Sequence, residues 1–153
     1  MIVATLTPGG STCATEEASV AHRLAVMLTG RAPNLTIGAD DENASTSLQA
    51  AGLVVICATA RQGTVDPQLL ELLRSGWDIG EAMVFIVTIG PWPQENQTAD
   101  RRMRPLLLDA GAFCPAPSLH ISNGLLAGME SYSRYWAPFV GSLASTASWC
   151  SES

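Results

Sequence analysis

The sequence predicts an α/β domain in which helices cover both faces of a parallel sheet. Short apolar, β-branched runs alternate with stretches whose apolar residues recur every three or four positions. Parallel neighbours require crossover connections, which are nearly always right-handed. The length of 153 residues and the hydrophobic content of 47% favour a single domain, residues 1–153, with a full core.

The first predicted unit is a strand, a tight turn and a helix. The run Ile2–Leu6 is apolar and partly β-branched, and it ends at "TPGG". In the helix that follows, Thr15 suits the cap, acidic residues suit the first turn, and Gly30 suits the stop. Its apolar positions recur at helical spacing: Ala18, Ala21, Leu24, Ala25 and Leu28.

The remaining pattern continues the alternation. Further strands are expected at Asn34–Ile37, Gly52–Ala60, Met83–Ile89 and Ser118–Ser122. Further helices are expected at Ser47–Ala51, from Pro67 to near Gly76, at Ala99–Ala110, and within Tyr132–Trp149. Proline is poorly tolerated beyond the first turn of a helix, so Pro105 weakens the third of these helices and Pro138, with Gly141, interrupts the last.

Five strands in this sequence order fit a doubly wound, three-layer α/β/α sheet of order 2-1-3-4-5. Such sheets bind ligands beyond the carboxyl ends of their strands, where the order reverses. That geometry selects three loops as a candidate site: Thr7–Thr15, Thr59–Asp66 and Gly90–Thr98.

The first of these loops has two readings. Its glycines and hydroxyl groups precede a helix N-terminus, a place that binds phosphate and other anions through free N–H groups and the helix dipole. It is equally well read as a plain turn capped by Thr15. Glu16 and Glu17 compete with an anion for the same positive potential.

Charge and composition exclude several classes of protein. The net charge is -6, and all eight cations are arginine, so nucleic acid is not an expected partner. No apolar run approaches 18 residues and the start lacks a basic leader, which favours a cytoplasmic protein that does not enter a membrane. The four cysteines lack a C-x-x-C pair, so free thiols are expected and a zinc site is not.

Other reactive side chains do not form a catalytic constellation. Arg101, Arg102 and Arg104 either bind an anionic ligand or form an exposed helix face. His22 and His120 have no evident catalytic partner and are interpreted as structural. Cys13 stands before a helix, where a thiol pKa falls, but no histidine adjoins it. Neither catalytic side chains nor metal ligands are therefore assigned.

From Ser47 to Ser122 the chain resembles the flavodoxin-like NAD(P)H-dependent FMN reductases, including those that supply reduced flavin to alkanesulfonate monooxygenases. The segment "QAAGLVVICATARQGTVDPQLLELL" is similar to the family's central strand, "TPvY" loop and following helix. The strand "MVFIVTIG" and the segment "ADRRMRPLLLDAGAFCPAPSLHIS" resemble the family's next strand and helix. The resemblance implies a flavodoxin-like fold.

The N-terminal "LTPGGST" resembles the family's "GSPRxxS" flavin-phosphate loop. Thr7 and Pro8 match the Ser-Pro pair, and Gly9 replaces the arginine, so the hydroxyl and amide cradle is kept without its cation. The resemblance implies that the FMN phosphate contacts Thr7, Pro8, Gly9, Gly10, Ser11, Thr12 and Thr15.

The other two loops match the family less fully. In the second, Ala60 replaces a proline, Gln62 replaces an aromatic residue, and Glu71 replaces a helix lysine. In the third, Ile89-Gly90 stands where the family has two glycines, and Trp92 offers a face that can stack on a flavin. By resemblance, the flavin ring lies along Thr59, Ala60, Arg61, Gln62, Gly63 and Thr64 on one side and Gly90 and Trp92 on the other.

The implied reaction is hydride transfer from NADPH or NADH to FMN, or through FMN to another acceptor such as a flavin-dependent monooxygenase. The flavin performs the chemistry, so no side-chain acid or base is needed. The resemblance also implies a homo-oligomer, such as a dimer, and the tail offers aromatic residues for that contact or for the monomer's own core: Tyr132, Tyr135, Trp136, Phe139 and Trp149.

Two alternatives remain open. The first is a flavodoxin-like scaffold that has lost flavin binding and serves as a partner subunit or in a non-redox reaction, which the altered loops favour. The second is a nucleoside deoxyribosyltransferase-like enzyme, suggested only by "DIGEAM", which resembles an acidic helix motif of that class.

Overall fold

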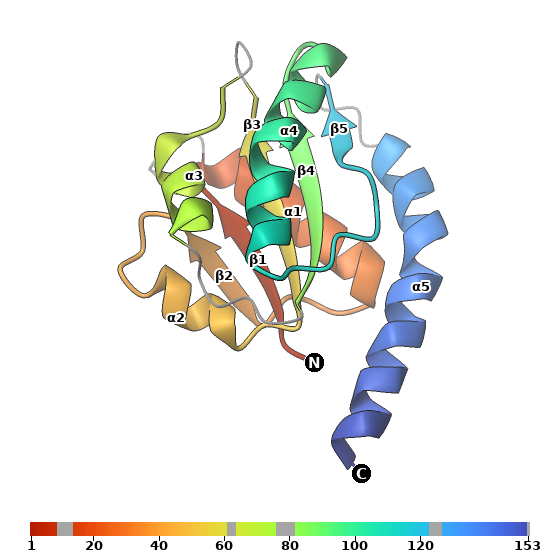
Figure 1. The fold of residues 1–153 in the computed structure, drawn as a ribbon. Helices are drawn as coiled ribbons and strands as arrows, with labels where there is room; N and C mark the ends of the chain where they lie inside the picture. Colours follow the sequence, from red (N-terminus) through yellow and green to blue (C-terminus); the bar gives the residue numbers. More distant parts are fainter. Residues whose placement is uncertain (9–13, 61–63, 76–81, 123–126, 153) are drawn as a thin grey trace.

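Five parallel strands form the centre of the protein in a computed structural model, with helices on both faces of the sheet (Figure 1). The structure describes residues 1–8, 14–60, 64–75, 82–122 and 127–152. The strand order is β2-β1-β3-β4-β5. The predicted doubly wound order 2-1-3-4-5 is confirmed.

Strands and helices alternate along the whole chain. The strands are β1 Val3–Thr7, β2 Leu35–Gly38, β3 Leu53–Thr59, β4 Met83–Ile89 and β5 Leu119–Ile121. The helices are α1 Ala14–Thr29, α2 Ala44–Gln49, α3 Pro67–Arg74, α4 Pro93–Asp109 and α5 Ala127–Glu152. Each predicted strand agrees with the observed one to within one residue at either end, because long apolar runs buried on both faces leave little ambiguity.

Alternate residues of β3 and β4 point into two separate hydrophobic cores. On one face, Val54, Ile56 and Ala58 of β3 pack with α3 and α4. On the other face, Leu53, Val55 and Cys57 pack with α1 and α5. Figure 1 shows α3 and α4 on the near side of the sheet, with α1 behind it. Because successive side chains of a strand point to opposite faces of the sheet, one apolar strand contributes to both cores.

Two helices with an internal proline, α4 and α5, differ from their predictions. Helix α4 begins at Pro93 rather than Ala99 and continues through Pro105. Proline is well placed at the first helical position, and Pro105 is exposed, while the opposite face of the helix buries Ala99, Met103 and Leu107. The helix predicted through Pro105 is confirmed, because packing of that apolar face outweighs one missing hydrogen bond, but its predicted start at Ala99 was wrong.

The last helix is also longer than predicted. Helix α5 runs unbroken from 127 to 152, through Pro138 and Gly141. Both residues are exposed, whereas Met129 and Val140 are buried against the sheet layer. The final turns of α5 extend past the edge of the sheet in Figure 1, where the blue end of the ribbon stands apart from the other elements.

Three smaller corrections concern segment ends. Helix α2 covers 44–49 rather than 47–51. Helix α1 begins at Ala14, so Thr15 lies in its first turn and not at the cap position. Because α4 starts at Pro93, the third predicted loop shrinks from 90–98 to 90–92. The expected helix stop at Gly76 lies outside the described residues.

Adjacent leucines on α4 test the assignment of its buried face. Leu107 is 0% exposed and Leu108 is 52% exposed. Replacing Leu107 with alanine should lower the free energy of unfolding by about 2–5 kcal/mol, because it leaves a cavity under the helix. The matched change Leu108→Ala should cost about 0.5 kcal/mol. Urea denaturation measures both, and equal losses would contradict this orientation of α4.

Candidate functional site

The carboxyl ends of β1, β3 and β4 meet at one edge of the sheet. β3 pairs with β1 up to Leu6 and Ile56, and with β4 up to Thr59 and Ile89. β3 therefore extends beyond β1, and Thr59 lies at the edge where the strand order reverses. This is the part of a doubly wound sheet that binds ligands.

Three described backbone groups at this edge are bonded within the protein. The carbonyl of Thr7 accepts from the N–H of Ala39 at 2.8 Å. The N–H of Ala60 donates to Ile89 at 2.8 Å, and the N–H of Gly90 donates to Ile121 at 3.1 Å. These bonds continue the ladder past the ends of the strands, so these groups hold the edge in shape rather than facing a ligand.

A buried carboxylate lies directly beside the edge. Glu17, in the first turn of α1, is 3% exposed, and its Oε1 accepts a hydrogen bond of 2.9 Å from the Thr59 hydroxyl. The bond joins residues 42 positions apart and ties the start of α1 to the end of β3. A carboxylate is favoured near a helix N-terminus by the helix dipole. The Glu17 carboxylate thus partly neutralises the positive potential at the N-terminus of α1 that would attract an anionic ligand.

The same carboxylate acts on a neighbouring thiol. Cys57 on β3 is buried, and burial raises its pKa well above the usual value, with the negative charges of Glu17 and Glu16 raising it further. A protonated, buried thiol is a poor nucleophile. Cys57 therefore contributes packing rather than reactivity, and Cys13 lies outside the described residues.

Close backbone approach fixes the third loop. A β-carbon at Gly90 would lie 2.8 Å from the Ala60 carbonyl oxygen and 3.2 Å from Glu95 Oε2. Only glycine therefore fits between the ends of β3 and β4. Two residues further on, Trp92 precedes α4 with its side chain 63% exposed. It is a large apolar face beside the ligand-binding edge, available for contact.

A second polar cluster lies under the start of α4 and was not predicted. The Thr88 hydroxyl donates to Asn96 Oδ1 and lies 3.2 Å from His120 Nδ1. His120 Nε2 is buried without a hydrogen-bond partner among the described residues. Because side chains alternate along a strand, Thr88 and His120 lie on the face of the sheet that α4 covers. Asn96 reaches them only because α4 begins at Pro93.

The structure brings together part of the predicted site. Thr7, Pro8, Thr59 and Ala60 lie at the carboxyl edge with Gly90 and Trp92, and Thr64 is exposed in the connection to α3. The side chain of Thr15 is not described. Seven further predicted positions lie outside the described residues, as does most of "DIGEAM": Gly9, Gly10, Ser11, Thr12, Arg61, Gln62 and Gly63.

The arginine group on α4 does not act as one unit. Arg104 forms an ion pair with Asp100 at 2.9 Å, and its hydrogen bond to Asp100 raises the pKa of the guanidinium. Arg101 and Arg102 are exposed. Among the described residues, no cluster of His, Cys, Asp and Glu side chains is arranged to hold a metal ion. In the same part of the chain, no helix is long and apolar enough to span a membrane.

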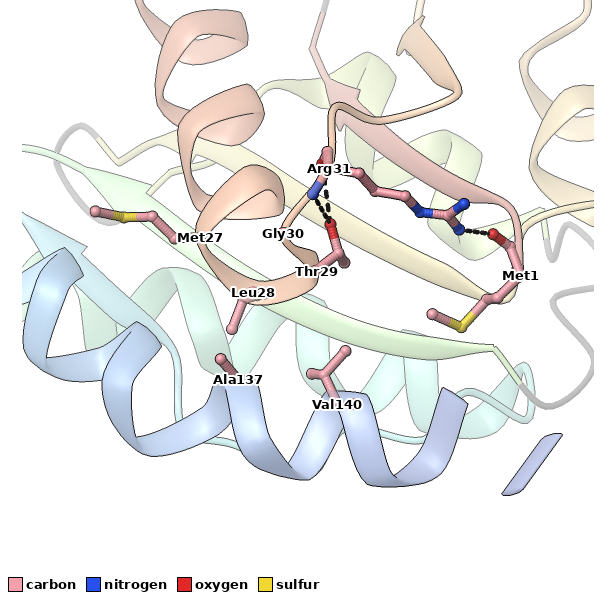
Figure 2. Close-up of a pocket in the computed structure, with 9 residues that line it drawn as sticks. Met1, Met27, Leu28, Thr29, Gly30, Arg31, Ala137 and Val140 are labelled. Carbon is pink, nitrogen blue, oxygen red and sulfur yellow. Dashed lines mark hydrogen bonds between the residues drawn. The ribbon is translucent and has the colours of Figure 1, made fainter. Parts of the chain in front are cut away.

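A cavity of about 440 Å³ opens at the opposite end of the sheet, between the end of α1 and α5 (Figure 2). Met27, Leu28, Ala137 and Val140 form its apolar walls. The Arg31 guanidinium closes one side by donating to the Met1 carbonyl. Because α1 runs back from the carboxyl edge, this cavity is remote from Thr59 and Gly90 and belongs to a different part of the molecule.

The Glu17–Thr59 bond should be measurable as stability. Replacing Thr59 with valine keeps the side-chain shape but removes the donor from a buried carboxylate, and the free energy of unfolding should fall by about 1–3 kcal/mol. Thr59→Ser keeps the hydroxyl and should lose less. Thermal or urea denaturation at neutral pH compares them, and equal losses would show that the bond does not contribute.

Comparison with known proteins rests on structure alone, because no protein-family model and no curated protein sequence matches the chain. An oxidoreductase from Corynebacterium diphtheriae superposes with a TM-score of 0.71 at 14% identity, covering 95% of this chain and 96% of the other. An NADH:FMN oxidoreductase in its apo form gives 0.70 at 13% identity over 90% and 87%. Flavodoxin 1 from Bacillus cereus gives 0.68 at 14% identity over 92% and 98%. These likenesses and the strand order establish that the chain has the flavodoxin-like fold.

Proposed function

We propose that this protein binds FMN at the carboxyl edge of its sheet and transfers hydride from NADPH or NADH to it. The observation that carries the proposal is that Thr7 and Thr59 lie where the strand order reverses, with Gly90 and Trp92 after the neighbouring strand β4 at the same edge of the sheet. The names of the similar structures support it, since they include an NADH:FMN oxidoreductase and flavodoxins.

The described residues fit a flavin ring better than they fit its phosphate. Trp92 exposes 63% of its surface beside Gly90, where an aromatic face can stack on isoalloxazine. Thr59 adds a half-buried hydroxyl whose oxygen can still accept a hydrogen bond while its proton is donated to Glu17. For the phosphate, the start of α1 offers backbone donors, but the Glu17 carboxylate lies beside them.

FMN supplies the redox chemistry when it is bound, accepting hydride and passing electrons on. The chain's own residues would hold and shield it. Thr7 and Pro8 would form the base of the phosphate loop, Thr59 to Thr64 would line one edge of the ring, and Gly90 with Trp92 would cover the other side and exclude water. No side chain needs to take or give a proton in this scheme.

The finer parts of the proposal follow the resemblance stated above. The electron acceptor would be free flavin or a flavin-dependent monooxygenase, and the protein would work in the cytoplasm as a homo-oligomer. The exposed Tyr135 and the partly buried Trp136 and Phe139 of α5 are the aromatic residues available for that contact. Trp136 and Phe139 also pack edge to face with each other. The same helix would therefore serve both the contact between subunits and the packing of the monomer.

Flavin binding is tested by adding FMN, removing the excess, and recording the visible spectrum and the flavin fluorescence. The proposal predicts a retained flavin spectrum that NADPH or NADH bleaches. Trp92→Ala should weaken FMN binding by about threefold to tenfold, through loss of one aromatic stacking contact.

The matched control for that variant is Tyr135→Ala. Tyr135 is also aromatic and is 73% exposed, but it lies on α5, away from the edge. It should leave FMN affinity unchanged. A wild-type protein that stays colourless and does not quench flavin fluorescence at high micromolar FMN would refute the proposal.

A second candidate function is a flavodoxin-like scaffold that does not bind flavin and works as a partner subunit. The observation that favours it is the buried Glu17 carboxylate at the helix N-terminus, where a phosphate dianion would meet like charge. The scaffold hypothesis accounts for the hydrogen bonds that the described polar groups of this edge make to one another.

The two candidates predict different behaviour for Glu17→Gln, which keeps an acceptor for Thr59 and removes the charge. If the protein is a flavin reductase, FMN affinity should rise by about threefold to tenfold. If it is a flavin-free scaffold, wild type should not bind and the variant should gain only weak binding. Glu16→Gln is the control, because Glu16 is exposed and its charge is screened by solvent. Fluorescence titration with FMN measures the affinity of wild type, Glu17→Gln and Glu16→Gln.

A further inference from the structure

A groove on the outer flank of the molecule combines fixed and free cationic groups. It has a volume of about 320 Å³ and lies between α4 and the segment that leads into β5. That volume is at the lower end of the range for small-molecule sites. Its lining residues are Asn96, Gln97, Asp100, Arg101, Arg104, Pro117 and Ser118.

Arg104 is held rigidly on one wall of the groove. Its Nε and Nη2 contact the Asp100 carboxylate at 2.9–3.2 Å, and Nη2 also donates to the Ala116 carbonyl at 3.1 Å. Ser118 completes the arrangement by donating to the same carboxylate. The Tyr132 hydroxyl donates to the Pro117 carbonyl at 2.8 Å, which fixes the opposite wall. The Asp100 carboxylate is thus bonded to groups of the protein itself. Nη1 of Arg104 makes no hydrogen bond to a described residue.

The remaining lining side chains are mainly donors without a described partner. Arg101 is exposed and makes no ion pair or hydrogen bond within the described residues. Asn96 accepts from Thr88 through Oδ1, which leaves its NH₂ group for the groove. Gln97 adds a second exposed amide. Two arginines and one aspartate give the groove a positive balance in a chain whose net charge is -6.

We propose that this groove binds the phosphate group of a small phosphorylated compound. Arginine forks and amide N–H groups match the several oxygens of a phosphate, and a pre-fixed guanidinium loses little freedom on binding. The groove lies beside α4 and β5, whereas the flavin proposal concerns the loops after β1, β3 and β4. The lining residues of the groove include none of those proposed to contact flavin, so each proposal can be tested without the other.

The test is an NMR titration of the full chain with inorganic phosphate, against sodium chloride at matched ionic strength. Saturating amide shifts are expected at the lining residues of the groove. Arg101→Gln should weaken phosphate binding about tenfold, through loss of one charge-assisted contact. Arg102→Gln is the matched control, since Arg102 is an exposed neighbour on the same helix and does not line the groove. It should stay within about twofold of wild type.

Three results would overturn the proposal. The first is the absence of saturation, and the second is an equal loss in Arg101→Gln and Arg102→Gln, which would indicate general attraction to charge. The third is a set of phosphate-induced shifts at Thr7 and Thr59 that disappear when FMN is added. That result would place the phosphate in the flavin phosphate loop. Persistence of the groove shifts with FMN present supports the site whether or not FMN itself binds.

Discussion

Burial of β3 on both faces is the constraint on which the rest of the molecule depends. The first six of its seven residues are buried, so it must have a paired strand on each side and a helical layer above and below. Those requirements place β1 and β4 beside it and divide the core into two. They also bring Thr59, the last residue of β3, to the edge where the order reverses. The position of the candidate flavin site is thus a consequence of packing a strand whose first six residues are buried.

The polar groups at that edge are tied to one another across elements. Glu17 joins α1 to β3 through Thr59, and Thr88 joins β4 to α4 and β5 through Asn96 and His120. Such bonds pre-organise the site, because they fix helices against strand ends without a ligand. They also set its charge, which is negative at the start of α1. A cofactor bound there would meet a rigid edge that favours the neutral ring over the anionic phosphate.

The sequence predicted the sheet well and the helices less well, for physical reasons that differ. The apolar strands were predictable because double burial leaves a continuous signal, and their alternation with helices predicted a parallel sheet that fits the doubly wound order. Helix α5 was predicted as interrupted because proline rules describe isolated helices, whereas packing against the sheet carries it through Pro138. Helix α4 was predicted too short because its start at Pro93 was missed. The Glu17–Thr59 contact joins residues 42 apart and has no local signal. The groove beside α4 depends on where that helix starts, so it was equally hidden.

Gly90 and Trp92 lie in the same loop, but a steric requirement explains the first residue and not the second. The hypothetical β-carbon of Gly90 would meet the Ala60 carbonyl at 2.8 Å, so any side chain there would force apart the ends of β3 and β4. Relatives that bind flavin and relatives that do not would retain this glycine alike, and its persistence over evolution would carry no information on cofactor use. Trp92, exposed and under no comparable steric demand, is the position at which such lineages would diverge.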